Sequence, residues 1–210
     1  MHAMGSGTGV AHGLGKLGQF GFNQPVLAVC GDSTFFHATI PALINGIYNQ
    51  SDFILVILDN NATAMTGFQP HPGTGMTAMG EPTKAVSMEA LCRSLGARVE
   101  VCDPFDLKST TATLLEMMAE GSGAKVAIMR RECELVRGRK EKPPYKMHVD
   151  PDKCIGEACG CDRLCTRVFL CPGLIWDKKT GKSKIDEVMC TGCGVCADIC
   201  PQGAIIKEAA

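Results

Sequence analysis

Residues 25–61 read PVLAVCGDSTFFHATIPALINGIYNQSDFILVILDNN, and this stretch decides the fold. Two short apolar runs, at residues 25–32 and 52–61, flank a stretch near Thr34–Asn49 that suits a helix. Aliphatic residues fill both runs without polar alternation, which is typical of strands buried on both faces of a parallel sheet. The stretch therefore predicts a strand, a crossover helix and a second strand parallel to the first.

The same alternation continues as far as Arg130. Further helices are expected near Met88–Leu95 and Leu107–Glu120, and further strands at residues 97–103 and 124–130. Strands that alternate with helices indicate an α/β domain with a parallel sheet covered on both faces. Ligands of such sheets bind beyond the carboxyl ends of the strands, so informative side chains should directly follow the first two strands.

The last third of the chain has a different composition, because nine of the 13 cysteines lie between Cys154 and Cys200. Crowding of this kind indicates metal binding rather than a disulfide scaffold. Residues 190–201, CTGCGVCADICP, match the bacterial two-cluster ferredoxin run, in which the fourth cysteine serves the other [4Fe–4S] cluster. Zinc sites usually pair two CxxC units, so this run favours iron–sulfur clusters.

The partner half, residues 154–172, is irregular but ends in the same Cys-Pro pair. Crossed ligation predicts one cluster on Cys171, Cys190, Cys193 and Cys196. The other cluster is expected on Cys154, Cys165, Cys200 and either Cys159 or Cys161. A regular module would place the open ligand at Asp162, so Cys161, one residue away, is the predicted ligand and Cys159 the alternative. The remaining cysteines, Cys30, Cys92, Cys102 and Cys133, are expected to behave as small hydrophobic residues.

A charged segment separates the two regions. Residues 131–150 read RECELVRGRKEKPPYKMHVD and contain a Pro-Pro pair, so no regular element is expected there. The sequence predicts an α/β domain at residues 1–130 that is incomplete at its N-terminus. A linker at 131–149 and a small α+β ferredoxin-like domain at 150–210 should follow.

Composition excludes several classes of protein. The 210 residues are 45% hydrophobic with a formal net charge of −1, which does not suit a nucleic-acid partner. No apolar stretch reaches the roughly 18 residues of a membrane span, and the first residues lack the features of a signal peptide. We therefore expect a soluble, cytoplasmic protein that contacts neither nucleic acid nor membrane.

Polar side chains follow the first two expected strands. Gly31-Asp32-Ser33 ends the first strand, and Asn60-Asn61 ends the second, 28 residues beyond Asp32. This arrangement resembles the cofactor motif of thiamine-diphosphate enzymes, which begins Gly-Asp-Gly and ends Asn-Asn, although Ser33 departs from its second glycine. A diphosphate needs a divalent cation, and Mg²⁺ prefers hard oxygen ligands. The resemblance implies that the Asp32 carboxylate, the Asn60 amide oxygen and the Ala62 backbone carbonyl bind Mg²⁺.

Two further segments resemble 2-oxoacid:ferredoxin oxidoreductases. Residues 64–69, AMTGFQ, resemble the Met-Thr-Gly-Gly-Gln segment that lies against the diphosphate in that family, and residues 4–7, MGSG, resemble an upstream loop. With the two-cluster module, the chain most closely resembles the large subunit of indolepyruvate:ferredoxin oxidoreductases. The resemblance implies cofactor contacts from Met4, Gly5, Gly31, Asp32, Ser33, Asn60, Asn61, Met65 and Thr66.

That family resemblance also implies an activity: oxidative decarboxylation of a 2-oxo acid to an acyl-CoA, with electrons passing through two clusters to ferredoxin. His37 and His71 are candidates to face the substrate. The pyrimidine-binding half of the thiamine site should lie on another subunit or domain, beside a smaller oxidoreductase subunit. The expected protein is thus one part of a hetero-oligomer, inactive alone.

Two other classes of protein share parts of this sequence pattern. The main alternative is an electron-transfer protein whose thiamine-diphosphate domain is degenerate, which would keep its clusters but show no dependence on the cofactor. A thiamine-dependent decarboxylase without redox chemistry would need no cysteine-rich module, so the cysteines disfavour it.

Overall fold

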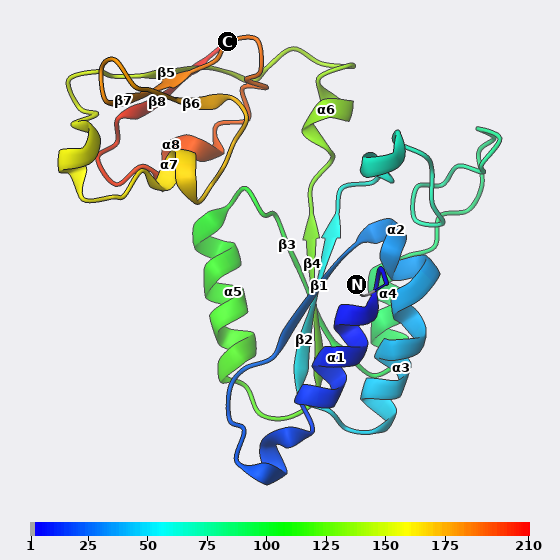
Figure 1. Ribbon diagram of the computed structural model, residues 1–210. Coiled ribbons are helices and arrows are strands. Elements are labelled where there is room, and N and C mark those ends of the chain that lie inside the picture. Colours follow the sequence, from blue (N-terminus) through cyan, green and yellow to red (C-terminus); the bar gives the residue numbers. More distant parts are fainter. Residues whose placement is uncertain (1–2) are drawn as a thin grey trace. The chain divides into compact units, whose positions relative to one another are not determined.

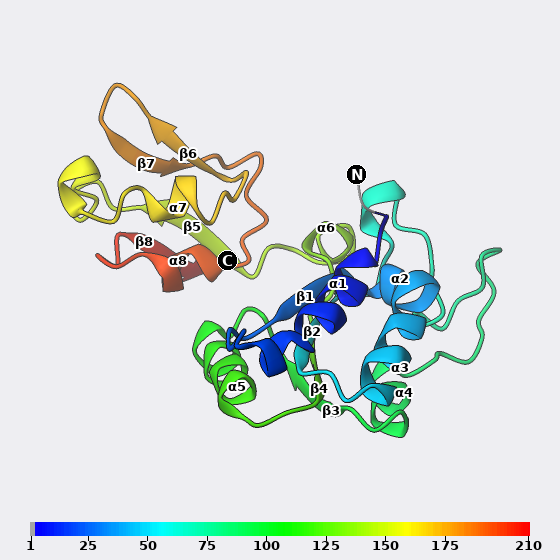
Figure 2. The ribbon, with the colours of Figure 1, turned by 60° about the horizontal axis from the view of Figure 1, so that its bottom comes forward.

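The computed structural model describes residues 3–210 and divides the chain into two compact units, Met1–Cys133 and Glu134–Ala210. Both units are shown in Figures 1 and 2. No helix in the described range is long and apolar enough to cross a membrane.

The first unit is built on a four-stranded sheet in the order β1-β2-β4-β3, in which every neighbouring pair is parallel. The strands are β1 (Leu27–Gly31), β2 (Phe53–Asp59), β3 (Arg98–Cys102) and β4 (Ala124–Arg130). Each strand lies inside one of the apolar runs of the sequence. The predicted α/β class with a parallel sheet is confirmed.

Helices cover both faces of this sheet (Figure 1). α1 (Ser6–Leu14), α3 (Ile40–Tyr48) and α4 (Met88–Ser94) lie on one face, and α5 (Leu107–Ala119) lies on the other. The central strand β2 shows why its sequence is apolar throughout. Leu55 and Ile57 pack on the first face, whereas Ile54 and Val56 pack beneath α5.

The helical segment after β1 is irregular. α2 (Asp32–Thr34) continues into a π-helical turn, η2 (Phe35–Thr39), before α3 begins at Ile40. Pro41 explains the wide turn, because a proline cannot donate an N–H to the carbonyl four residues before it. The helix predicted near Thr34–Asn49 is present, and the π-helical turn interrupts it. Turns of this kind are rare and often lie at functional sites.

The second unit contains two small antiparallel sheets. β5 (Tyr145–Val149) pairs with β8 (Ile205–Ala209), and β6 (Leu174–Asp177) pairs with β7 (Lys182–Ile185). The short helices of this unit are α6 (Glu134–Arg137), α7 (Leu164–Arg167) and α8 (Val195–Ile199), and a 3-10 turn lies at η4 (Gly156–Cys159). The first unit has 3-10 turns at η1 (Leu17–Phe20) and η3 (Ala64–Thr66). The core packs Met147, Leu174, Cys196 and Ile205 together. This is the expected small α+β domain.

The expectation of an irregular linker at residues 131–149 is wrong. The segment holds α6 and β5, and Met147 of β5 is buried in the core of the second unit. Arg137 is bound by Glu134 at 2.6 Å and donates to the carbonyl of Thr191 at 3.2 Å. The charged residues are therefore used in folding, and the strand pairing that orders β5 comes from β8, far along the chain.

Candidate functional site

Asp32 is the first residue of α2, directly beyond the carboxyl end of β1, and its side chain is buried with 3% of the residue exposed. Its Oδ1 accepts a hydrogen bond from Ser33 N–H at 2.7 Å. Its Oδ2 accepts from the N–H groups of Asn60 at 3.1 Å and Ala62 at 3.3 Å. The carboxylate thus joins the ends of β1 and β2, which lie side by side in the sheet.

The surroundings of Asp32 favour its charged form. Burial alone would raise the pKa of the carboxyl, but the contact with His71 and the backbone N–H donors outweigh burial, so the pKa lies below its ordinary value. A buried, ionised carboxylate at the end of a strand suits a cation ligand.

The structure brings the three expected Mg²⁺ ligands into one hydrogen-bonded cluster. Asn60 Oδ1 accepts from Ala62 N–H at 3.1 Å, and the Ala62 carbonyl accepts from Ala64 N–H at 2.9 Å. Asn61 lies between them with φ of 59°, a left-handed conformation that asparagine tolerates. The donor set of one carboxylate, one amide oxygen and one backbone carbonyl fits a hard divalent cation.

The Met4–Gly5 loop lies against the helical segment that follows Asp32. Gly5 has φ of 80°, and a Cβ there would stand 2.9 Å from Ala38 Cβ and 3.3 Å from Thr39 Oγ1. The N-terminal ends of α1 and α2 both lie at the carboxyl end of the sheet (Figure 1). Gly31 and Ser33 flank Asp32 at that end and are half-buried. Helix N-termini present free N–H groups to anions, so this side of the cluster fits the diphosphate.

The segment after Asn61 closes on itself. Thr66 Oγ1 donates to Gln69 Oε1 at 2.6 Å, and Gln69 Nε2 donates to the Thr66 carbonyl at 2.7 Å. Phe68, at the second glycine of the segment it resembles, keeps a left-handed φ of 67°. Met65 at the tip is 95% exposed. The turn therefore has the backbone conformation of a glycine pair and presents Met65 outward.

The structure separates the two candidate histidines. His37 is exposed on the π-helical turn η2. His71 is buried, its ring stacks on Phe36 with centroids 5.6 Å apart, and its Nε2 lies 3.1 Å from Asp32 Oδ2. The angle at Nε2 falls outside the range of a hydrogen bond, so this contact is close but not aligned. Only His71 belongs to the Asp32 cluster.

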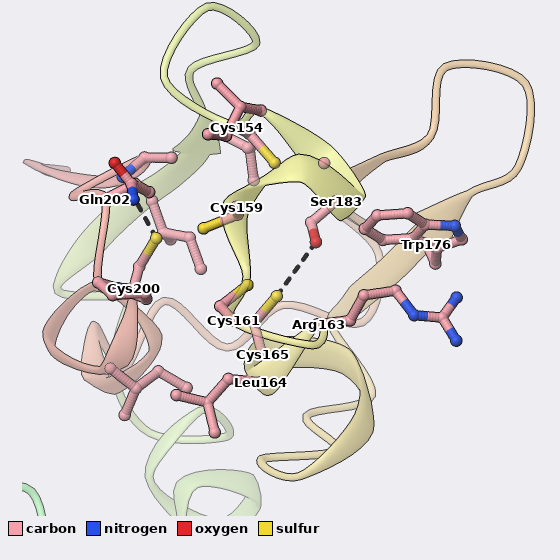
Figure 3. Close-up of a pocket in the computed structure, with 17 residues that line it drawn as sticks. Cys154, Cys159, Cys161, Arg163, Leu164, Cys165, Trp176, Ser183, Cys200 and Gln202 are labelled. Atoms are coloured by element: carbon pink, nitrogen blue, oxygen red, sulfur yellow. Dashed lines mark hydrogen bonds between the residues drawn. The ribbon is translucent and has the colours of Figure 1, made fainter.

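Two cysteine-lined cavities lie in the second unit. One is lined by Cys171, Cys190, Cys193 and Cys196, the set expected from crossed ligation. The other is lined by Cys154, Cys159, Cys161, Cys165 and Cys200 (Figure 3). Each cavity thus combines one cysteine from the opposite half of the module with three or four from its own. Soft thiol donors in groups of four fit iron–sulfur clusters.

Within residues 3–210, no three His, Cys, Asp or Glu side chains are arranged around a single-ion site. The ligands of a cubane cluster bind different iron atoms and need not converge on one point.

Cys159 and Cys161 differ in their surroundings. Burial would raise the pKa of Cys161, but a hydrogen bond from Cys159 and the N–H groups of Leu164 and Arg163 bring it below the ordinary value. The pKa of Cys159 is raised, chiefly because its thiol donates to Cys161. Asp162 and Arg163 both adopt left-handed backbone angles, with φ of 47° and 57°. Within this turn the Leu164 N–H donates to the Cys161 carbonyl at 3.0 Å.

Three of the four isolated cysteines behave as expected. Cys30, Cys92 and Cys102 are buried, and burial raises the pKa of Cys30 to about 11 and that of Cys92 to about 12. Cys133 is half-buried at the end of the first unit.

A parallel sheet with a carboxylate–amide cluster at its carboxyl edge, followed by a module with two cysteine-lined cavities, defines a thiamine-diphosphate-binding domain joined to a ferredoxin-like domain. Residues 1–136 match the family model described as "Thiamine pyrophosphate enzyme, C-terminal TPP binding domain". Residues 183–206 match the "4Fe-4S binding domain". The chain belongs to the thiamine pyrophosphate (thiamine diphosphate) enzymes.

Curated relatives narrow this family. "Indolepyruvate oxidoreductase subunit IorA" of Pyrococcus horikoshii is 42% identical over 98% of this chain and 33% of its own length. The subunit of the same name from Archaeoglobus fulgidus is 41% identical over 96% of this chain and 31% of its own length. The resemblance seen in the sequence is confirmed, and the chain spans about a third of the length of these relatives.

A shorter match concerns another oxidoreductase subunit. "Pyruvate synthase subunit PorD" of Methanothermobacter marburgensis is 39% identical over 64 residues, which are 30% of this chain and 67% of PorD.

Proposed function

We propose that the chain is the thiamine-diphosphate- and cluster-binding part of an indolepyruvate:ferredoxin oxidoreductase, which converts an arylpyruvate to an acyl-CoA and reduces ferredoxin. The observation that carries the proposal is the presence of the Asp32 cluster and two cysteine-lined cavities in one chain similar to IorA over 98% of its length. When bound, thiamine diphosphate supplies the carbanion chemistry of decarboxylation, and [4Fe–4S] clusters accept electrons singly.

In this proposal the first unit binds and orients the cofactor. The Asp32 carboxylate, the Asn60 amide and the Ala62 carbonyl would hold Mg²⁺, which neutralises the diphosphate. The Met4–Gly5 loop and the turn at Met65–Thr66 would contact the diphosphate. Because Asp32 is buried, water competes poorly with the diphosphate for the metal.

The second unit would carry the electrons. Cys171, Cys190, Cys193 and Cys196 would hold one [4Fe–4S] cluster. Cys154, Cys161, Cys165 and Cys200 would hold the other. An N–H donor lies beside one of these sulfurs, since Ala204 N–H donates to Cys200 Sγ at 3.3 Å. Hydrogen bonds to cluster sulfurs raise the reduction potential and so assist electron acceptance.

Partners complete the proposed enzyme. The curated relatives are about three times as long as this chain, which supports a further subunit or domain that carries the pyrimidine-binding half. A smaller oxidoreductase subunit, coenzyme A as co-substrate and ferredoxin as electron acceptor complete a cytoplasmic hetero-oligomer. Phe36 beside His71 supports an aromatic 2-oxo acid as substrate.

The test is ferredoxin reduction by the complex assembled from this chain and its partner subunits. With thiamine diphosphate, Mg²⁺ and coenzyme A present, kcat/KM should be higher for indolepyruvate than for pyruvate. Omission of thiamine diphosphate should stop the reaction. If the clusters exchange electrons with ferredoxin but no 2-oxo acid ever reduces them, the alternative is correct: an electron-transfer protein with a degenerate thiamine-diphosphate domain.

A further inference from the structure

The loop that begins at His71 is held by its own hydrogen bonds. Thr74 donates twice to the His71 carbonyl, from its N–H at 2.9 Å and from its hydroxyl at 2.8 Å. Gly73 has no room for a side chain, because a Cβ would stand 3.0 Å from Phe36 Cε2 and 3.1 Å from His71 Cε1. The imidazole is therefore fixed between Phe36 and the loop backbone.

The hydrogen bonding assigns different roles to the two ring nitrogens. Gly73 N–H donates to His71 Nδ1 at 3.2 Å, so in the neutral ring Nδ1 is the acceptor and Nε2 carries the hydrogen. Nε2 lies 3.1 Å from Asp32 Oδ2 and has no aligned partner among the described residues. A buried donor without an aligned acceptor costs free energy and calls for an explanation.

The two oxygens of Asp32 are not equivalent. Oδ2 receives the N–H groups of Asn60 and Ala62 and also faces His71 Nε2. Among the described residues, Oδ1 receives only the N–H of Ser33. Oδ1 is therefore the oxygen with free lone pairs for a cation, and the contacts at Oδ2 determine where Oδ1 points.

We infer that His71 is a positioning residue for the metal site: its Nε2–H lies against Asp32 Oδ2 and so favours the orientation in which Oδ1 is free for the Mg²⁺ of the cofactor. This inference rests on the proposed function and deepens it. Partners that orient a metal ligand without touching the metal typically contribute about 10- to 100-fold to metal affinity. The rival explanation is that His71 only holds its own loop, through Nδ1 and Gly73.

Two substitutions separate these roles. In His71→Gln, the side-chain Nε2 can take the place of the imidazole Nε2 and donate to Asp32. In His71→Asn, the side-chain oxygen can still accept from the N–H two residues on, as in an Asx turn, but the shorter side chain does not reach Asp32. A positioning role predicts that His71→Gln keeps a higher Mg²⁺ affinity than His71→Asn. A loop-holding role predicts the reverse.

The experiment is calorimetric titration of thiamine diphosphate into the complex assembled from the cluster-loaded chain and its partner subunits, over a range of Mg²⁺ concentrations. His71→Asn should raise the Mg²⁺ concentration for half-maximal binding by about 10- to 100-fold. His71→Gln should change it by less than about threefold, and thermal unfolding of both variants should resemble the wild type.

His12→Asn is the matched control in the same unit. His12 binds Ser51 Oγ at 2.6 Å and Asn45 at 3.0 Å, away from the Asp32 cluster, so its loss should leave the Mg²⁺ requirement unchanged. The inference is overturned if His71→Asn binds as the wild type does, or if Gln is impaired as much as Asn. Failure of the wild-type complex to bind the cofactor at any Mg²⁺ concentration would instead refute the proposed function, and this inference with it.

Discussion

At the scale of single residues, Asp32 combines burial with three N–H donors and one imidazole on its two oxygens. Such a carboxylate stays ionised well into the acidic range, since its pKa is lowered. Its charge is therefore available to a cation at every pH at which the enzyme would work. The same contacts make it part of the fold, because it joins the ends of two neighbouring strands.

Asp32→Ala should abolish Mg²⁺-dependent binding of thiamine diphosphate and ferredoxin reduction in the assembled complex. It should also destabilise the first unit by about 1–3 kcal/mol, because the N–H groups of Ser33 and Asn60 lose their acceptor. Cluster absorbance should survive. Calorimetry, activity and visible spectra would check the three expectations, and activity at saturating substrate and ordinary Mg²⁺ would refute the metal site.

The surplus cysteine gives a second residue-scale prediction. Cys161→Ser should lose or convert one cluster, because Cys161 lies one residue from Asp162, where a regular module would place the ligand. Cys159→Ser should leave iron content and the reduced electron paramagnetic resonance spectrum unchanged. The opposite pattern would make Cys159 the ligand, and loss in neither variant would mean that the two thiols replace each other.

These residues also show how far sequence reasoning reaches. Asp32 and Asn60 could be placed together from the sequence, because parallel neighbouring strands bring their carboxyl ends to one edge. The pairing of His71 with Asp32 could not, since a long irregular loop decides which way the imidazole faces. Phe68 stands where the segment it resembles has a glycine, and its left-handed φ of 67° is a conformation typical of glycine.

At the scale of elements, the cluster-binding run depends on its packing against β5. Gly192 has φ of 68°, and a Cβ there would collide with the Tyr145 carbonyl and stand 2.8 Å from Pro143 Cβ. Strand β5 is an element that the sequence did not predict, because its partner β8 lies about 60 residues away. The charge and proline content of residues 131–150 predicted an irregular segment. Pairing with β8 nevertheless makes Tyr145–Val149 a strand.

Gly192→Ala should therefore separate the cysteine run from β5 and lower the occupancy of the cluster expected on Cys190, Cys193 and Cys196. Gly181→Ala is the control. Gly181 shares a positive φ of 65° but faces open space, so alanine there costs only the left-handed backbone, about 1–2 kcal/mol. Iron content after anaerobic purification would distinguish them. Equal iron in both variants would show that the close approach to Tyr145 is unimportant.

At the scale of the whole molecule, each unit carries one kind of site. The first carries the Asp32 cluster, and the second carries both cysteine-lined cavities. Because the two kinds of site lie in separate units, a substitution that abolishes cofactor binding should leave cluster binding unchanged, and the reverse should also hold. This independence allows one to be disabled while the other serves as an internal control.

The anaerobically purified chain should contain about eight irons in two [4Fe–4S] clusters, because the two cavities each offer at least four thiols. Iron analysis with Mössbauer spectroscopy would count and type the clusters. Zinc in stoichiometric amounts without iron would remove the electron-transfer role.

The central claim is that electrons from a 2-oxo acid reach the clusters only through thiamine diphosphate held at Asp32. The direct measurement is low-temperature electron paramagnetic resonance of the assembled complex, frozen after indolepyruvate is added without any other reductant. A reduced [4Fe–4S] signal should appear with thiamine diphosphate and Mg²⁺. The signal should be absent without them or in Asp32→Ala, although dithionite still reduces the clusters of that variant. A signal of equal size without thiamine diphosphate, or none with it while dithionite reduces the clusters, would contradict the account.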